Sequence, residues 1–359
     1  MSSPNPGPLR WGIIATGAIS SAFAKDLILS RADANAQHII TAIGSSSLSK
    51  GLAFVSENIP HVSPAPEVYE GYQSVYTDPN VDIVYIGTLH SFHKQNCIDA
   101  IHAGKHVLCE KPFTLNARDA QEVFALAKEK GVFVMEAMWT RFFPLTISLQ
   151  HLLHEEKVIG DVLRVFADFS TDHKLSEKGM DSRLKNPALG AGSLLNLGVY
   201  SLTWALLALD GQIGEVAEEL EIKGVQTLDE GIDVASTVVV SFPSTGRQGV
   251  CTSSSCFKSP SKEFCRIEGS KGHVVVEGLF ASRPDAFTLF PKDPTGNPVK
   301  RYRFDILGGG FYWEADAVAV DIAAGRTQNE RMPWAETIRV MGIMDEARRQ
   351  GGARFPGDD

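Results

Sequence analysis

The stretch Arg10-Trp-Gly-Ile-Ile-Ala-Thr-Gly-Ala-Ile-Ser20 decides the fold, because a short apolar strand runs there directly into a tight turn and a helix. The turn reads Ala15-x-Gly17-x-x-Ser20, a modified form of the three-glycine fingerprint of dinucleotide sites. The middle glycine, which lets the backbone approach a pyrophosphate, is kept, and the helix can offer free N–H groups to phosphates. An ordinary strand-turn-helix unit explains the turn equally well. We assign candidate cofactor contacts to Ala15, Thr16, Gly17, Ala18 and Ile19.

Outward from this turn, apolar strands alternate with amphipathic helices. The clearest helix covers 116–130, where Asn116 can cap the start and Gly131 can end it. Continuous apolar strands between such helices predict a mostly parallel sheet covered on both faces. We therefore predict an α/β fold with a Rossmann-type, doubly wound parallel sheet in residues 1–143. The expected strands are Trp11–Ala15, His38–Ile43, Asp82–Gly87, His106–Cys109 and Val132–Glu136.

A second informative stretch, Glu110-Lys111-Pro112, follows the fourth of these strands. Proline has no N–H for a neighbouring strand, so it ends the strand here. A lysine that becomes buried must be paired or neutralised. Ligands bind at the carboxyl ends of the strands in open α/β sheets, so the position of this motif favours a functional role. The alternative is a surface Glu–Lys pair in a loop.

The pattern changes after about Pro144. A helix over 145–156 precedes a series of short strands, several of them joined by turn residues such as Gly269-Ser-Lys-Gly272, which predicts antiparallel pairing. We predict a C-terminal α+β domain, residues 144–359, with a large open, mostly antiparallel sheet, and expect the substrate in the cleft between the two domains. The expected strands are 162–170, 217–226, 233–242, 249–256, 263–269, 273–277, 287–290 and 301–304, with closing helices at 311–324 and 334–349.

Composition excludes several function classes. The 359 residues carry a formal net charge of -9, which argues against nucleic acid as a default partner. Residues 1–8 have no apolar core and are expected to be a flexible leader, and no segment looks long and apolar enough to span a membrane. The five cysteines show no metal spacing, so we expect reduced thiols in a cytoplasmic protein without a metal. They are Cys97, Cys109, Cys251, Cys256 and Cys265.

These motifs together resemble the Gfo/Idh/MocA (glucose-fructose oxidoreductase-like) dehydrogenases over nearly the whole chain. The branch with the closest resemblance contains dimeric dihydrodiol dehydrogenase and the fungal NADP-dependent D-xylose 1-dehydrogenases. The resemblance rests on the N-terminal turn, Tyr76–Gly87, His90 with His93, Glu110-Lys111-Pro112, Glu136–Pro144, Gly190–Tyr200 and Gly310–Ala315. It implies a homodimer that associates through the open face of the C-terminal sheet.

The expected chemistry is oxidation of a hydroxyl group, which needs a hydride acceptor at the carbon and a base for the hydroxyl proton. The resemblance implies that Lys111 is catalytic and that Tyr200 assists it. Tyr200 as a cap on a buried helix is the alternative. The branch usually reads Asp-x-Gly-x-Tyr where this chain has Asn196, and an amide orients a hydroxyl but holds no proton. We predict catalytic roles for Lys111, Tyr200 and Asn196, all three also in contact with substrate.

Further ligand contacts are predicted around these residues. Trp139, Arg141 and Phe142 follow the last strand of the first sheet and are expected to wall the pocket, with core packing as the alternative for Phe142. His93 matches a recurring histidine of the family, although backbone hydrogen bonding explains it equally well. Arg183 could reach a substrate hydroxyl or be plainly solvated. The predicted cofactor contacts in this region are Thr88, Leu89, His90, His93, Glu110, Lys111, Trp139 and Arg141.

The choice between NADP and NAD is made at the end of the second strand. An NAD site favours an acid there for the ribose 2′-hydroxyl, and the segment 41–50 contains none. Hydroxyls of Ser45, Ser46 and Ser47 with the charge of Lys50 predict NADP. The alternative is a serine-rich helix cap, with Ser47 serving the next helix.

The sequence thus favours an NADP-dependent dehydrogenase of an aldose such as D-xylose, oxidised at C1, or of a trans-dihydrodiol. A non-catalytic dinucleotide-binding sensor of the same fold is the second hypothesis. Lys111 and Tyr200 favour the enzyme, since a sensor needs no proton relay, whereas Asn196 favours the sensor.

Overall fold

The computed structural model describes residues 7–295, 297–356 and 358, and the chain forms two compact units. The first unit comprises Met1–Thr114, Arg118–Phe142 and Ile306–Thr337. The second comprises Leu115–Ala117, Phe143–Asp305 and Ile338–Asp359. The first six residues of the predicted leader lie outside the described residues.

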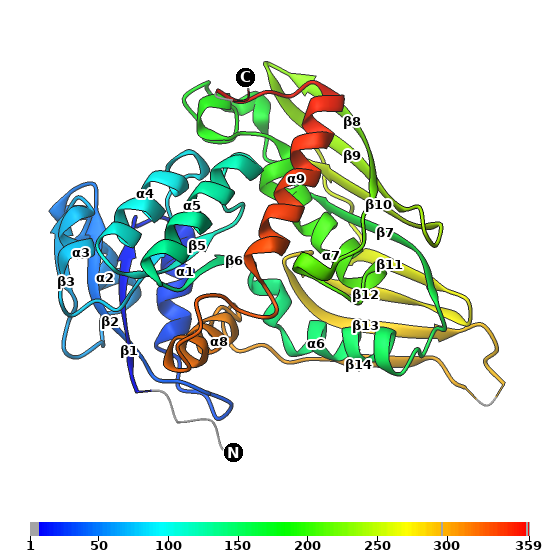
Figure 1. Ribbon diagram of the computed structural model, residues 1–359, viewed down its shortest axis with the longest axis horizontal. Helices are drawn as coiled ribbons and strands as arrows, with labels where there is room; N and C mark the ends of the chain where they lie inside the picture. The colour runs from blue at the N-terminus through cyan, green and yellow to red at the C-terminus, as the bar shows by residue number, and fades with distance from the viewer. Residues whose placement is uncertain (1–6, 296, 357, 359) are drawn as a thin grey trace. The chain divides into compact units, whose positions relative to one another are not determined.

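The first unit is built on six parallel strands in the order β3-β2-β1-β4-β5-β6 (Figure 1), which confirms the predicted doubly wound parallel sheet. The five expected strands are present, and β3 was missed because it is a short, half-exposed edge strand. The strands are β1 Leu9–Ile14, β2 His38–Ser45, β3 Glu67–Glu70, β4 Ile83–Ile86, β5 His106–Glu110 and β6 Val134–Ala137. The helices are α1 Ala18–Leu27, α2 Leu48–Asn58, α3 Gln73–Thr77, α4 His90–His102, α5 Ala117–Lys130, the 3-10 turn η1 Trp139–Phe142 and α8 Tyr312–Ala323.

The return of Ile306–Thr337 to the first unit differs from the expectation that everything after residue 143 belongs to the second domain. The carboxylate of Asp26, near the end of α1, accepts the backbone N–H groups of Gly310 and Phe311 at 2.6 and 2.9 Å. The ring of Phe311 stacks on Trp139 with centroids 4.0 Å apart. These long-range contacts fasten the start of α8 to the first unit.

The second unit carries eight strands in the order β14-β13-β12-β11-β7-β10-β9-β8. One neighbouring pair, β7 with β10, is parallel and the other pairs are antiparallel, as predicted. The turn Gly269–Gly272 joins β11 and β12 as an antiparallel hairpin. The strands are β7 Val162–Ser170, β8 Glu221–Asp229, β9 Ile232–Phe242, β10 Arg247–Ser254, β11 Glu263–Gly269, β12 Gly272–Phe280, β13 Arg283–Pro291 and β14 Lys300–Arg303.

Helices support one face of this sheet. The α-helices are α6 Pro144–Gln150, α7 Val199–Leu209 and α9 Trp334–Gly351, of which α9 begins within the first unit. Two π-helical segments, η2 His151–Glu155 and η5 Leu194–Gly198, continue α6 and precede α7. The 3-10 turns are η3 Leu175–Glu177, η4 Pro187–Leu189 and η6 Gly214–Val216. Every residue of α7 is buried, and the helix packs on β7, β10 and β11.

The central helical segment corrects one expectation. Pro187–Leu209 is long and apolar enough to cross a membrane by composition, but 94% of its apolar window is buried inside the protein, as in a core helix. The opposite face of the sheet carries half-exposed side chains, among them Phe166 and Val250. Homodimerisation through that face stays a prediction. Four of the five unpaired cysteines are buried, whereas Cys256 is exposed beyond the end of β10 rather than within the strand as expected.

Candidate functional site

The turn between β1 and α1 has the backbone of a phosphate-binding loop. Ala15 adopts φ 67°, the left-handed region that glycine prefers, in the position where the fingerprint usually has its first glycine. Gly17 and Ala18 are exposed, and no atom of the described residues lies within 4 Å of where a Gly17 side chain would begin. The N-terminus of α1 is therefore open to a ligand, and its N–H groups fit the pyrophosphate of a dinucleotide.

Ser20 explains how the third glycine of the fingerprint can be replaced. Its side chain is fully buried in α1, and a Cβ at Gly87, directly after β4, would lie 2.2 Å from the Ser20 hydroxyl oxygen. The third glycine of the usual motif allows close packing between helix and strand. In this protein the small residue that allows the close packing is Gly87, directly after β4, instead of a glycine in the helix.

The loop after β2 separates the predicted cofactor serines into two groups. The Ser45 hydroxyl is buried and lies 3.1 Å from the Thr16 hydroxyl. Ser47 caps α2 by accepting the Lys50 backbone N–H, which confirms the alternative interpretation of this residue. Exposed Ser46 and Lys50 are hydrogen-bonded to each other at 3.2 Å, so they remain the groups available for a 2′-phosphate.

Lys111 follows a buried acid that organises its surroundings. Glu110 accepts the Tyr85 hydroxyl at 2.6 Å and the Lys111 backbone N–H at 3.2 Å. Burial raises the pKa of Glu110, and these donors together with the Lys111 charge oppose the rise. The Lys111 side chain is half-buried, and the Lys111 backbone N–H is held by buried Glu110. This arrangement excludes the simple reading of Glu110 and Lys111 as a surface pair.

A further buried acid, Glu314 of α8, was not foreseen. Neither of its carboxyl oxygens has a hydrogen-bond partner among the residues that the structure describes. Burial and the neighbouring charge of Glu110 raise the pKa of Glu314 well above its usual range. Glu314 is thus a buried acid of the first unit whose surroundings favour the protonated form.

His93 has a structural role. The ring is fully buried, with Nδ1 lying 3.0 Å from the Pro112 carbonyl and Nε2 lying 3.1 Å from the Thr88 carbonyl. Burial lowers the pKa of His93, so the neutral ring donates to one of these carbonyls. The alternative of backbone hydrogen bonding is confirmed, and His93 joins the loop before α4 to the Lys111-Pro112 loop. His90 and Leu89 lie at the start of that helix.

The aromatic and basic residues after β6 are mostly core. Arg141 is 2% exposed and donates to Glu336 at 2.6 Å, which does not fit a role in walling a ligand pocket. A buried guanidinium requires such a partner, and Glu336 supplies it from 195 residues away. Phe142 is buried, which agrees with the alternative prediction that it packs in the core. Trp139 is 8% exposed and lies against Phe311.

In the second unit, the candidate residues come from the π-helical segment and the start of α7. Tyr200 is 3% exposed, and its ring meets Phe169 edge to face with centroids 5.4 Å apart. The Asn196 amide nitrogen lies 3.4 Å from Nε2 of His173, beyond the end of β7. Arg183 is exposed, which favours the solvated alternative, although partial burial of the guanidinium lowers the pKa of Arg183.

His173 and Asp233 are the residues of this region that sequence reasoning missed. Asp233 is 1% exposed at the start of β9 and is hydrogen-bonded to the segment that carries Asn196. A polar pair after a strand, Asp172-His173, and an acid opening an apolar strand were the signals available. Both are common at strand ends, so neither was distinctive.

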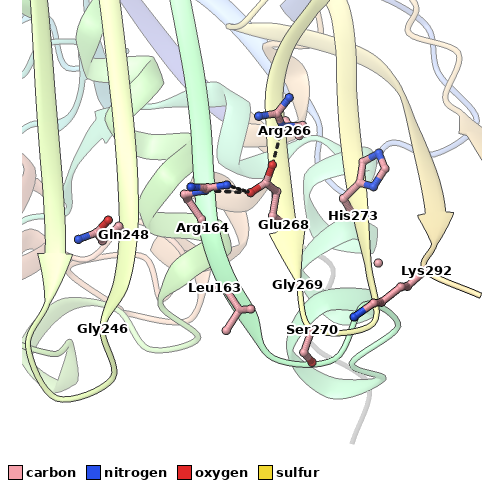
Figure 2. A pocket seen from close by; sticks show the side chains of 11 residues that line it. Leu163, Arg164, Gly246, Gln248, Arg266, Glu268, Gly269, Ser270, His273 and Lys292 are labelled. Atoms are coloured by element: carbon pink, nitrogen blue, oxygen red, sulfur yellow. Dashed lines mark hydrogen bonds and ion pairs between the residues drawn. The ribbon is translucent and has the colours of Figure 1, made fainter.

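A hollow of about 760 Å³ lies elsewhere in the second unit and contains none of the predicted site residues. Figure 2 shows Arg164, Glu268 and Arg266 joined in a row across β7 and β11, with His273 and Lys292 beside them. Glu268 pairs with Arg164 at 2.7 Å and with Arg266 at 2.9 Å, so one carboxylate offsets both guanidinium groups. No group of three or more His, Cys, Asp or Glu able to hold a metal occurs in the described ranges.

Two family models match the sequence. Residues 9–138 match the Gfo/Idh/MocA model described as "Oxidoreductase family, NAD-binding Rossmann fold", and residues 149–275 match the GFO/IDH/MocA C-terminal domain. The chain is 37% identical to "D-xylose 1-dehydrogenase (NADP(+))" of Hypocrea jecorina, over 99% of this chain and 95% of the relative. It is 32% identical to "Trans-1,2-dihydrobenzene-1,2-diol dehydrogenase" of Danio rerio, over 98% and 99%.

Solved structures share the fold. An aldose-aldose oxidoreductase from Caulobacter crescentus superposes with a TM-score of 0.80 at 21% identity, covering 96% of this chain and 98% of that one. A 3-ketoreductase from Actinomadura kijaniata, solved with NADP and TDP-benzene, has a TM-score of 0.79 at 22% identity over the same shares.

Proposed function

Because the chain belongs to the Gfo/Idh/MocA oxidoreductase family, we propose that it is an NADP-dependent dehydrogenase that oxidises an aldose at C1, with D-xylose as the candidate substrate. One observation carries this proposal: the 37% identity to a named D-xylose dehydrogenase extends over 99% of the chain. Lys111 and Tyr200, the residues assigned to proton transfer, are both present.

The proposed reaction divides between a hydride and a proton. The C1–H bond of the sugar breaks, the hydride leaves, the hydroxyl loses its proton and the sugar becomes a lactone. A bound oxidised nicotinamide supplies the hydride acceptor. We assign removal of the hydroxyl proton to Lys111, with Tyr200 assisting and the Asn196 amide orienting the hydroxyl. The backbone of Lys111 is held by Glu110, and that of Asn196 by hydrogen bonds within the second unit.

The proposed cofactor preference is NADP over NAD. Support comes from the absence of an acid in 41–50 and from the exposed Ser46–Lys50 pair after β2. Dissociation constants for NADPH and NADH, measured on the same preparation, test the preference directly. Tighter binding of NADH would overturn it.

A trans-dihydrodiol is the second candidate substrate. The 32% identity to a zebrafish dihydrodiol dehydrogenase, again over nearly the full length, supports it. Trp139, which is 8% exposed and stacked on Phe311, is the aromatic residue that we assign to either ring. The named relatives give no support to the non-catalytic sensor.

The test is NADPH formation by the purified protein with NADP and D-xylose, D-glucose, L-arabinose or a trans-dihydrodiol. We expect saturable turnover, with D-xylose preferred, and a fall in kcat on the order of 100- to 10,000-fold in Lys111→Met, because a positioned proton acceptor contributes that much. Lys128→Met, exposed on α5 of the same unit, is the matched control. Full activity of Lys111→Met would show that Lys111 takes no part in the mechanism. Turnover of the trans-dihydrodiol alone would make the diol, and not the sugar, the substrate.

A further inference from the structure

We propose that Asp233 of β9 is a positioning residue that anchors the π-helical segment η5 and thereby places Asn196 and Tyr200. This inference rests on the proposed function, since it assigns a purpose to the segment that carries two of the candidate catalytic groups. Asp233 is remote in sequence from the residues it serves and touches no substrate in the mechanism above.

Asp233 gathers three donors on one oxygen. Its Oδ2 accepts the Ser193 hydroxyl at 2.8 Å, the Leu194 backbone N–H at 2.7 Å and the Ser236 hydroxyl at 2.7 Å. Leu194 is the first residue of η5 and Ser193 precedes it. The carboxylate therefore occupies the N-terminus of the helical segment, where backbone N–H groups lack partners and a negative charge is favourable.

The approach of the chain to Asp233 is shaped for this contact. Gly192 has φ +145°, and a Cβ there would lie 2.2 Å from Oδ1 of Asp233. A residue with a side chain would therefore push the carboxylate away or lift the segment off it. Oδ1 itself is buried and has no hydrogen-bond partner in the described ranges, so the carboxylate is held entirely through its other oxygen.

The side chains of the anchored segment are almost all packed in the interior. Of the residues from Ala191 to Tyr200, all are buried except Asn196, which is half-exposed. The five residues of η5 are wound as a π-helix, a form concentrated at functional sites. Relaxing η5 to an α-helix would rotate Asn196 relative to Tyr200. A fixed N-terminus opposes that rotation.

A second contact, from the neighbouring strand β10, also holds the start of η5. The Ser253 hydroxyl of β10 donates to the Ser193 hydroxyl at 3.2 Å, and Ser253 pairs with Ser236 across the sheet. Asp233, Ser236 and Ser253 thus hold the start of η5 against β9 and β10. Asn196 in turn lies 3.4 Å from His173, whose own backbone N–H donates to Ser255 at 2.9 Å.

The experiment compares Asp233→Asn with Ser236→Ala and with Thr237→Ala, an exposed neighbour on β9 that serves as the matched control. Readouts are kcat, KM for the sugar, the NADPH dissociation constant and hydrogen exchange of the amides of 193–200 in the folded protein. We expect Asp233→Asn to lower kcat on the order of tenfold to 100-fold, as small misplacements of catalytic groups do. NADPH binding stays unchanged, exchange over 193–200 rises, and Ser236→Ala shows the same pattern more weakly.

The outcomes separate this inference from the proposed function. If the wild type turns over and Asp233→Asn matches it in kcat and KM, the inference is wrong. If Asp233→Asn loses thermal stability while kcat per NADPH site and exchange over 193–200 are unchanged, its role is only structural and the inference again falls. If the wild type is inactive on every substrate, the proposed function fails, and the exchange result alone decides: a local rise supports the anchor and no rise overturns it.

Discussion

The two units solve one problem, holding a reactive segment with a buried carboxyl group, in different ways. In the first unit, Glu110 is the direct neighbour of Lys111 and shares its oxygens between a phenol and the Lys111 N–H. In the second unit, Asp233 is 40 residues from Ser193 and takes two hydroxyls and one N–H on a single oxygen. The first anchor is local in sequence, and the second exists only after the sheet has formed.

In both units, hydrogen-bond donors offset the cost of burying a carboxyl group. Burial raises the pKa of both Glu110 and Asp233, and in each case the hydrogen-bond donors oppose that rise. The more donors converge on a carboxylate, the better its charge is tolerated. An acid whose burial outweighs the effect of its donors should hold its proton to higher pH, and the first unit contains acids of this kind.

One such acid is Glu136 of β6, which gives the largest expected effect on stability. The Phe113 N–H donates to its Oε1 at 3.1 Å, but burial dominates and raises the pKa of Glu136 from its ordinary 4.5 to about 7. Between about pH 4.5 and 7 the folded protein keeps the Glu136 proton while the unfolded chain releases it. The contribution of this proton to the free energy of unfolding is therefore complete below about pH 4.5 and is lost as the pH rises through about 7. The gap corresponds to roughly 3 kcal/mol.

Glu136→Gln is therefore expected to gain stability relative to the wild type as the pH rises from about 4.5 to about 7, and then to run parallel to it. Urea-induced unfolding across this range measures the difference. Glu57→Gln, an exposed acid on α2, should show no such trend. A constant difference between Glu136→Gln and the wild type would show that folding does not raise the pKa of Glu136.

The next effect tests donor number directly, by removing one hydroxyl from each anchor. Tyr85→Phe takes one donor from Glu110, and we expect a loss of about 2 kcal/mol because the acceptor is a buried acid. Ser236→Ala leaves Asp233 with two donors, so we expect a loss of about 1 kcal/mol. Unfolding midpoints in urea measure both losses, with Tyr72→Phe and Thr237→Ala as controls. A larger loss of stability in Ser236→Ala than in Tyr85→Phe would contradict the idea that the number of donors sets the cost of losing one.

The same contrast explains what the sequence could predict. Long apolar strands such as β1 and β9, and the contiguous Glu110-Lys111 motif, were predictable because their signals are local. Asp233 and the Arg141–Glu336 pair were not, because their partners come from distant parts of the chain. His93 was ambiguous, since a histidine that bonds backbone carbonyls and one that binds a ligand leave the same trace in sequence.

The placement of 306–337 failed for a related physical reason. Nothing in its composition indicates that Gly310 and Phe311 donate their N–H groups to Asp26, some 284 residues earlier. The substitution of glycine by Ala15 was visible, but the backbone conformation that it adopts was not. The turn at Ala15 also differs from the approach to Asp233, because Gly192 has φ +145° with no side chain whereas Ala15 has φ 67° with one.

The smallest predicted effect concerns this difference. Alanine in the left-handed region is strained by about 1–2 kcal/mol, whereas glycine is not. Glycine also loses more backbone freedom on folding, which returns about 0.5–1 kcal/mol of that gain. Ala15→Gly should therefore stabilise the protein by roughly 0.5 kcal/mol, seen as a higher urea midpoint. Ala125→Gly, at an exposed position inside α5, should instead destabilise it by up to about 1 kcal/mol. Losses in both variants would mean that the turn after β1 accepts alanine without strain.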